Sequence, residues 1–255
     1  MRKYCILLVV ATLAFFTVSC EKDNSGPKPT VIKASGDILA ALEEYRALLG
    51  PNNGGTAGSQ ASGRREINWD GVPDEFSAPF NMPLDFFNTN TGTRARGAVF
   101  STPGSGVQVS ADSDNPSGAA PSFGNINPYY TQQFPAFSAQ RVFSPIGSNV
   151  VDLRFFVPGS TTKAVVKGFG AIYIDVDRVE NTAFEYFDIN DKSLGVYATP
   201  VLNEGHVFLG VFFEEAIVHR VRIEYGNASL GPSESGTVDV SVMDDFIYGE
   251  PQEAN

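Results

Sequence analysis

Apolar and polar residues alternate along several stretches in the second half of the chain. The clearest stretches are 151–157, 172–177, 217–225 and 238–243. A period of two is typical of strands that bury one face and leave the other in water. Turn-forming pairs such as Pro158-Gly159 and Gly226-Asn227 separate these stretches. The pattern predicts a mainly β protein with an antiparallel β-sandwich, and the length of the chain favours a jelly roll over an immunoglobulin-like sandwich.

A helical period occurs once, at residues 37–49. Ile38, Leu42, Tyr45 and Leu49 would share one face of this helix. Asp37 is suited to cap its N-terminus, and the following Gly-Pro pair would end it. We expect one short helix that precedes the sandwich and lies on it, and a partner-binding helix is the alternative.

Composition divides the rest of the chain into segments. Residues 51–63 are rich in Gly, Asn and Ser and contain no large apolar side chain, which predicts a flexible linker. The β-sandwich domain is expected at 64–251, followed by a short tail at 252–255. Its first part, 66–141, is irregular but rich in aromatic residues, so we expect ordered loops there.

The N-terminus carries the features of an export signal. Arg2 and Lys3 precede an apolar segment at 4–18 that is short for a membrane span. Ser19-Cys20 follows and resembles the lipobox of bacterial lipoproteins. The resemblance implies a signal peptide at 1–19, lipid on Cys20, and a tether at 20–63 that includes the helix.

The residues after Cys20 refine the expected location. The charged segment 21–24 is similar to the surface-export signal of Bacteroidota lipoproteins. This resemblance implies a protein held in the outer membrane of the cell envelope by its N-terminal lipid, with exposure at the cell surface.

Charge and cysteine content exclude some classes of function. The formal net charge is −11, which disfavours nucleic acid as a partner. The two cysteines, Cys5 and Cys20, both lie near the N-terminus, so the predicted domain has no disulfide and no cysteine-based metal site.

Three segments carry a resemblance to a known kind of domain. They are Glu66-Ile67-Asn68-Trp69-Asp70-Gly71-Val72-Pro73, Arg96-Gly97-Ala98-Val99-Phe100-Ser101-Thr102-Pro103-Gly104 and Met243-Asp244-Asp245-Phe246-Ile247-Tyr248-Gly249. Together they resemble secreted bacterial jelly-roll domains found in proteins with C-terminal sorting tails, and the last segment looks like the final strand of carbohydrate-binding modules. In those modules an acidic residue of this strand often helps to hold a structural Ca²⁺. The resemblance therefore implies calcium at Asp245, Asp244 and Asp70, which are hard oxygen ligands.

Aromatic residues in the irregular part are candidates for ligand binding. A flat ring beside polar side chains is a common way to bind a sugar. We expect this role for Tyr129 and Tyr130, which lie close to Asn125 and Asn127, and for Trp69. The alternative is that these rings form the core of the loops, which is the favoured interpretation for Trp69.

Two carboxylates provide the only indication of catalysis. Asp175 and Asp177 would lie on one strand face about 7 Å apart, and glycoside hydrolysis uses carboxyl pairs about 5–10 Å apart. The sequence favours a lipid-anchored, non-catalytic binding module with carbohydrate as its ligand. The alternatives are a glycan-active enzyme that uses these two aspartates and a purely structural envelope protein.

Overall fold

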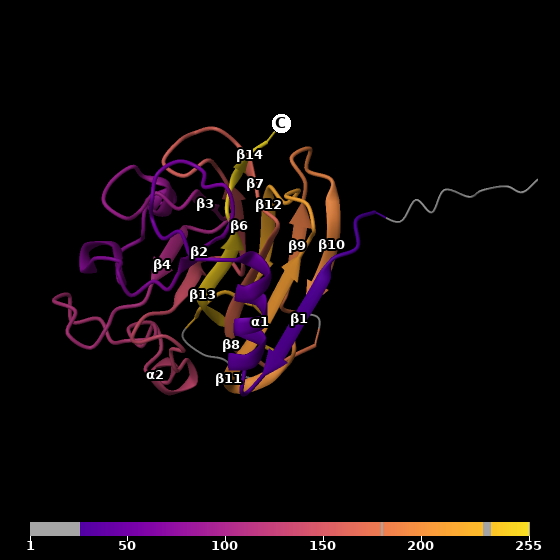
Figure 1. Cartoon of the computed structure of the whole chain (residues 1–255). Coiled ribbons are helices and arrows are strands. Elements are labelled where there is room, and N and C mark those ends of the chain that lie inside the picture. The colour runs from indigo at the N-terminus through magenta and orange to yellow at the C-terminus, as the bar shows by residue number, and fades with distance from the viewer. Residues whose placement is uncertain (1–25, 180, 232–235, 255) are drawn as a thin grey trace, which may run out of the picture.

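The computed structural model describes residues 26–179, 181–231 and 236–254. Cys20 and the predicted signal peptide lie outside these residues. Within them, no helix is long and apolar enough to cross a membrane. The chain folds into two antiparallel sheets that face each other, with long loops gathered beside β4 and α2 (Figure 1).

The larger sheet has seven strands. They are β1 (Thr30–Ser35), β2 (Arg64–Ile67), β4 (Gly106–Val109), β5 (Phe143–Ile146), β8 (Gly168–Val176), β11 (Leu202–Phe212) and β13 (Val242–Gly249). The smaller sheet has five, which are β3 (Ala98–Ser101), β6 (Val150–Phe155), β9 (Ala183–Phe187), β10 (Ser193–Ala198) and β12 (Arg220–Glu224). A separate two-stranded ribbon joins β7 (Ala164–Val165) to β14 (Gln252–Glu253).

The order of the strands is that of a jelly roll. The larger sheet contains β5-β13-β8-β11 side by side, and the smaller sheet contains β6-β12-β9-β10. Apart from β9 and β10, which pair within the smaller sheet, successive strands of these eight alternate between the sheets, which gives the arrangement of two Greek keys. The prediction of a mainly β, antiparallel, jelly-roll-like sandwich is confirmed. The remaining strands extend the edges of this framework.

The core between the sheets is aromatic. Phe246 of β13 lies at its centre, with its ring centroid 5.1 Å from that of Phe169 and 4.9 Å from that of Trp69. Further fully buried rings come from both sheets, including Phe143, Phe155 and Phe184. Burial of this much ring area is the main stabilising term of the fold.

The predicted helix forms as α1 (Leu39–Leu49), and the Asp37 carboxylate accepts a hydrogen bond from the Leu39 amide. Figure 1 shows α1 lying on the outer face of the larger sheet. Tyr45 inserts its ring over two glycines, Gly170 and Gly210, where an added Cβ would come within 2.8 and 2.7 Å of that ring. The glycines therefore make the room that lets the helix approach the sheet closely.

The segment predicted as a tether is part of the domain from Thr30 onward. Strand β1 precedes the helix and pairs with β11 along its whole length. Residues 51–63 are not a loose linker, because carbonyl groups at Gly54, Thr56 and Gly58 accept hydrogen bonds from the buried Arg65. Composition alone missed this, because the segment is ordered by polar contacts and not by side chains of its own. The predicted tail likewise pairs with β7 through β14.

Three short helices lie within the loops and complete the secondary structure. They are the 3₁₀ helices η1 (Asp74–Phe76) and η2 (Phe86–Asn88) and the single-turn helix α2 (Tyr130–Gln133). The first two carry residues of the pockets described next.

Candidate functional site

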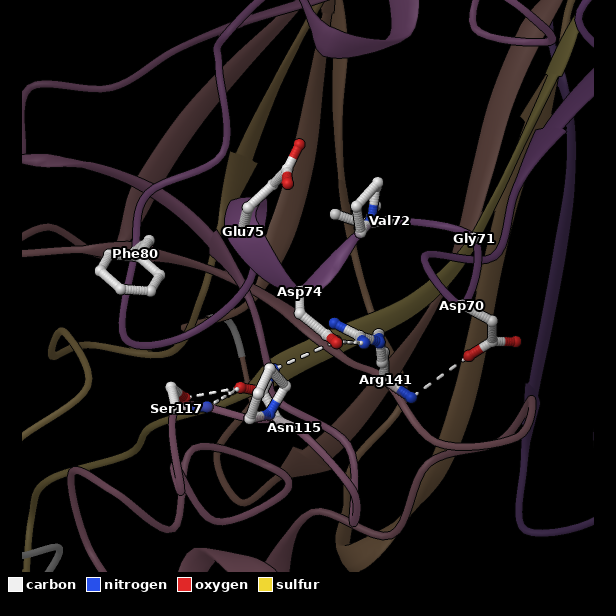
Figure 2. A pocket seen from close by; sticks show the side chains of 11 residues that line it. Asp70, Gly71, Val72, Asp74, Glu75, Phe80, Asn115, Ser117 and Arg141 are labelled. Atoms are coloured by element: carbon white, nitrogen blue, oxygen red, sulfur yellow. Dashed lines mark hydrogen bonds and ion pairs between the residues drawn. The ribbon is translucent and has the colours of Figure 1, made fainter.

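The largest of the pockets described here is an open cavity of about 810 Å³ among the long loops. We call it the Phe80 pocket. Its lining residues are Asp70, Gly71, Val72, Pro73, Asp74, Glu75, Phe80, Asn115, Pro116, Ser117 and Arg141. They come from three segments of the chain that lie far apart in sequence and meet at η1 (Figure 2).

Trp69 fixes the first of these segments. Its ring is stacked on Phe143 with a centroid distance of 4.2 Å, and its indole nitrogen donates a hydrogen bond to the carbonyl of Asp244. The backbone at Trp69 is left-handed, with φ of 67°, and its carbonyl accepts the amide of Val72. This turn starts the loop that runs along the pocket from Asp70 to η1.

Arg141 lies at the base of the pocket and joins its walls. Nη2 of Arg141 is 2.6 Å from Oδ1 of Asp74 and also contacts Asp112, and the Arg141 side chain is only 4% exposed. Its backbone amide donates to Asp70, as Figure 2 shows. Nε of Arg141 is buried and has no hydrogen-bond partner in the described part of the chain. Asn115, which is also buried, donates to both Asp74 and Ser77.

The open surface of the pocket is aromatic and acidic. Phe80 is 53% exposed, and it is the only phenylalanine among the exposed large apolar side chains of the described residues. Glu75 is exposed, and Asp70 and Asp74 are partly exposed. Burial raises the pKa of Asp70, and hydrogen bonds from Arg141 and Ser138 oppose that rise. The pocket therefore offers one ring face together with several hydrogen-bond acceptors.

The three aromatic residues singled out in the sequence do not form one site. Trp69 is 1% exposed and Tyr130 is fully buried, with its hydroxyl donating to the carbonyl of Gly231. Their burial does not agree with a role as ligand platforms, because neither ring face is open. Tyr129 is 52% exposed, and its hydroxyl donates to Glu204 at 2.6 Å. It belongs to a different part of the surface, and it does not line the Phe80 pocket.

The three predicted calcium ligands do come close together. Asp244 and Asp245 are adjacent on β13 at a register shift opposite β8, where an extra residue lets consecutive side chains share one side of the sheet. The Ser138 hydroxyl donates a hydrogen bond to Asp244, and a hydrogen bond from Ser138 also lowers the pKa of Asp70. All three carboxyls are thus grouped around one loop.

Hydrogen-bond donors and an arginine surround this group of carboxyls. Asp244 accepts hydrogen bonds from the amides of Phe137 and Ser138, at 2.6 and 3.2 Å, and from the Ser138 hydroxyl. Oδ2 of Asp245 lies 3.6 Å from Nη2 of Arg46. The other carboxylate oxygen of Asp245, Oδ1, is buried and has no hydrogen-bond partner among the described atoms. No group of three or more His, Cys, Asp or Glu within the described residues is arranged to hold a metal ion. The donors present leave few oxygens for Ca²⁺, which needs six or more ligands.

Burial and mutual repulsion dominate the titration of the pair. Burial, followed by the charge of Asp245, raises the pKa of Asp244 to about 8. Burial also raises the pKa of Asp245, and the nearby Arg46 opposes that rise. Asp244 is therefore mainly protonated at neutral pH.

The paired carboxylates predicted on β8 do not form a catalytic pair. Asp175 has a left-handed backbone with φ of 64° opposite an irregularity in β11, so the strict alternation of the strand is broken there. Its side chain is fully buried, accepts the amide of Glu204 at 2.7 Å and contacts Gln133. Asp177 lies beyond the end of the strand and is exposed. The expected shared face is therefore absent.

Sequence reasoning missed Phe80 and Arg141. Neither has a local signal, because the pocket joins residues about 40 to 70 positions apart through hydrogen bonds such as those from Asn115 and Arg141 to Asp74. A Phe between two prolines, as in the segment 79–83, is the one feature that could have suggested an exposed ring. Comparisons with protein-family models, with curated proteins and with solved structures find no match to the chain, so its function is argued from these residues alone.

Proposed function

We propose that this protein is a non-catalytic binding module that takes a carbohydrate in the Phe80 pocket. The observation that carries the proposal is the exposed ring of Phe80 in the lining of a cavity of about 810 Å³ that also presents the carboxylates of Asp70, Asp74 and Glu75. A ring face with nearby acceptors matches the two surfaces of a pyranose, which are an apolar C–H face and a rim of hydroxyls.

The acidic side chains support this ligand class. Asp70, Asp74 and Glu75 can accept hydrogen bonds from hydroxyl groups, and all three line the pocket. The ion pairs of Arg141 hold Asp74 in place before any ligand arrives. A preorganised site loses less conformational entropy on binding, which favours affinity.

The two alternative functions receive less support. An enzyme that uses Asp175 and Asp177 would need both carboxylates at a substrate, but Asp175 is fully buried and hydrogen-bonded. A purely structural protein would be favoured by a flat surface, whereas this surface is hollowed by the Phe80 pocket.

Binding to a glycan array tests the proposal. The soluble chain from Glu21 onward keeps β1 and α1, and it would be compared with Phe80→Ala and with the control Tyr129→Ala. We expect a polysaccharide hit that Phe80→Ala abolishes and Tyr129→Ala retains, because the Tyr129 ring is about equally exposed but lies outside the Phe80 pocket. Loss with Tyr129→Ala alone would place the site elsewhere, and a blank array from folded protein would contradict a carbohydrate ligand.

We also propose that lipid on Cys20 anchors the module in the outer membrane of the cell envelope. The support is the lipobox-like sequence at 17–20 behind a short apolar segment. In cells fed a labelled fatty acid, the wild-type chain should carry the label and sediment with membranes, and Cys20→Ala should do neither. Equal labelling of both proteins would contradict the anchor.

A further inference from the structure

A second pocket adjoins the Phe80 pocket and differs from it in charge. We call it the Arg94 pocket. It has a volume of about 300 Å³ and is lined by Asn68, Trp69, Gly71, Phe86, Phe87, Thr91, Gly92, Thr93, Arg94 and Arg96. Gly71 lines both pockets, which are therefore neighbours.

Neither arginine of this pocket is neutralised by a carboxylate. Six of the described arginines form ion pairs, and these are Arg46, Arg64, Arg65, Arg141, Arg220 and Arg222. Within the described residues no Asp or Glu lies at ion-pair distance from Arg94 or Arg96. In a chain with a net charge of −11, two such guanidinium groups in one cavity need a physical explanation.

Arg94 is held by aromatic rings. Its Cζ lies 4.1 Å from the centroid of Phe86 and 5.8 Å from that of Phe76. Stacking uses the face of the guanidinium and leaves its N–H donors at the edge of the plane. No hydrogen bond from the Arg94 side chain to another described residue is present, so these donors remain available to a ligand.

Arg96 lies deeper in the same pocket. Its Nε donates to the carbonyl of Thr93 at 3.3 Å and its Nη1 donates to the carbonyl of Glu66, both of which are neutral groups. Burial lowers the pKa of Arg96, and the charge of Glu66 opposes that decrease. A bound anion would oppose it further.

The loop that carries both arginines is fixed in place. The amide of Arg96 donates to the carbonyl of Phe87 at 2.9 Å, and the amide of Arg94 donates to Thr91 at 3.2 Å. Gly55 packs so tightly against this loop that an added Cβ would lie 1.6 Å from the carbonyl oxygen of Thr93. The pocket is therefore built by the fold and does not depend on chance side-chain positions.

We propose that the Arg94 pocket binds the anionic group of an acidic sugar, either a carboxylate or a sulfate ester. The planar donor edge of Arg94 suits the paired oxygens of either group. The charged side chains of the neighbouring Phe80 pocket are three carboxylates and Arg141, which is already paired with Asp74 and Asp112, so that pocket would take a neutral part of the same ligand. This inference rests on the proposed function and specifies an acidic polysaccharide as the ligand.

Matched monosaccharides test the charge requirement directly. Binding of methyl glucuronide, glucose 6-sulfate and methyl glucoside would be measured by NMR titration of the chain from Glu21 onward. We expect at least one acidic sugar to bind about tenfold more tightly than the neutral glucoside, because a charge-assisted hydrogen bond contributes that much. The acidic sugar that binds more tightly identifies the anionic group.

Variants assign the effect to the pocket. Arg94→Gln should remove the preference for the acidic sugar, and Arg94→Lys should keep part of it, because lysine retains the charge but not the planar donor edge. Arg178→Gln is the control, since it removes an exposed arginine that lies outside this pocket. Equal binding of neutral and acidic sugars by the wild type, or an unchanged preference in a folded Arg94→Gln protein, would overturn the inference.

Failure of the inference can be told apart from failure of the proposed function. Phe80→Ala should weaken acidic and neutral sugars alike and leave their ratio unchanged. If the array shows neutral glycans that depend on Phe80 while no acidic sugar is preferred, only the inference fails. If no sugar of either kind binds to the folded protein, both fail.

Discussion

Two buried arginines, Arg65 and Arg141, compensate their charge in different ways. Arg65 is fully buried and forms two bonds of 2.6 Å with Glu250, and its other N–H groups donate to four carbonyl oxygens. Arg141 contacts Asp74 and Asp112, but its Nε has no partner among the described atoms. Arg65 lines none of the pockets described above, whereas Arg141 lies at the base of the largest one.

This difference in hydrogen bonding distinguishes Arg65, which has a structural role, from Arg141, which lies at the candidate site. Arg65 joins the 51–63 segment to the C-terminal strand region, and all of its donors are used. Arg141 keeps unused hydrogen-bonding capacity beside an open cavity, and Arg94 and Arg96 continue this trend in the adjoining pocket. Incomplete compensation of a buried charge is a reason to consider the surrounding cavity as a candidate binding site.

Removal of Arg65 should have the largest effect. Arg65→Met leaves Glu250 buried without its cation, and we expect a loss of about 3–5 kcal/mol in the free energy of unfolding. Urea denaturation followed by far-UV circular dichroism would measure it. The double variant Arg65→Met/Glu250→Leu should recover part of the loss, because no unpaired charge remains. A loss under 1 kcal/mol in the single variant would show that this pair is not structural.

Removal of Arg141 should cost less stability and affect binding more. Asp74 is 41% exposed and can be hydrated in Arg141→Gln, so we expect a loss of about 1–3 kcal/mol. Binding of the array hit should fall at least tenfold, because Asp74 and the loop at Asp70 lose their common anchor. Calorimetric titration would measure the binding. Unchanged affinity would break the proposed distinction between the two arginines.

The buried carboxyl of Asp244 avoids an uncompensated charge in a third way, because it binds a proton. Its pKa is about 8 in the folded protein and 3.8 in the reference state, so the folded state binds more protons between these values. The stabilising contribution is therefore complete below about pH 4 and is lost as pH rises through 8. The charged groups around it are Asp245, Arg46, Glu66 and Asp70.

A pH series of unfolding experiments would test this compensation. We expect stability to fall from pH 5 to 8.5 and the slope to be smaller in Asp244→Asn, since Asn resembles the protonated acid. An unchanged slope in the variant would contradict the assignment. EDTA should leave the melting temperature of the wild type unchanged, and a clear decrease would instead support the calcium site predicted from the resemblance.

Alternation located β6, β12 and the second half of β8, but it did not reveal β11. The alternation at 151–157 and 217–225 corresponds to β6 and β12 of the smaller sheet. Strand β11 carries no alternation because α1 covers its outer face while the sandwich core covers the other. The need for glycine at positions 170 and 210 follows only from the structure, in which the Tyr45 ring packs against both.

The candidate site was the least predictable part of the molecule. Aromatic content correctly indicated ordered loops at 66–141, but it could not distinguish the buried Trp69 from the exposed Phe80. Trp69 is buried because its indole stacks on Phe143 and donates a hydrogen bond to the carbonyl of Asp244. Both partners are distant from Trp69 in sequence, so the sequence alone does not reveal these contacts. The charge of the Arg94 pocket was hidden for a similar reason, since an arginine without a carboxylate is recognised only after all partners are placed.

The location of the bound glycan is the most direct test of the account. Backbone amide shifts of the isotope-labelled chain would be mapped during titration with the oligosaccharide identified on the array. We expect the largest shifts at 70–80, 91–96 and 115–117, around the two adjoining pockets. Shifts centred instead on Tyr129 and Glu204, with none around Phe80, would contradict it.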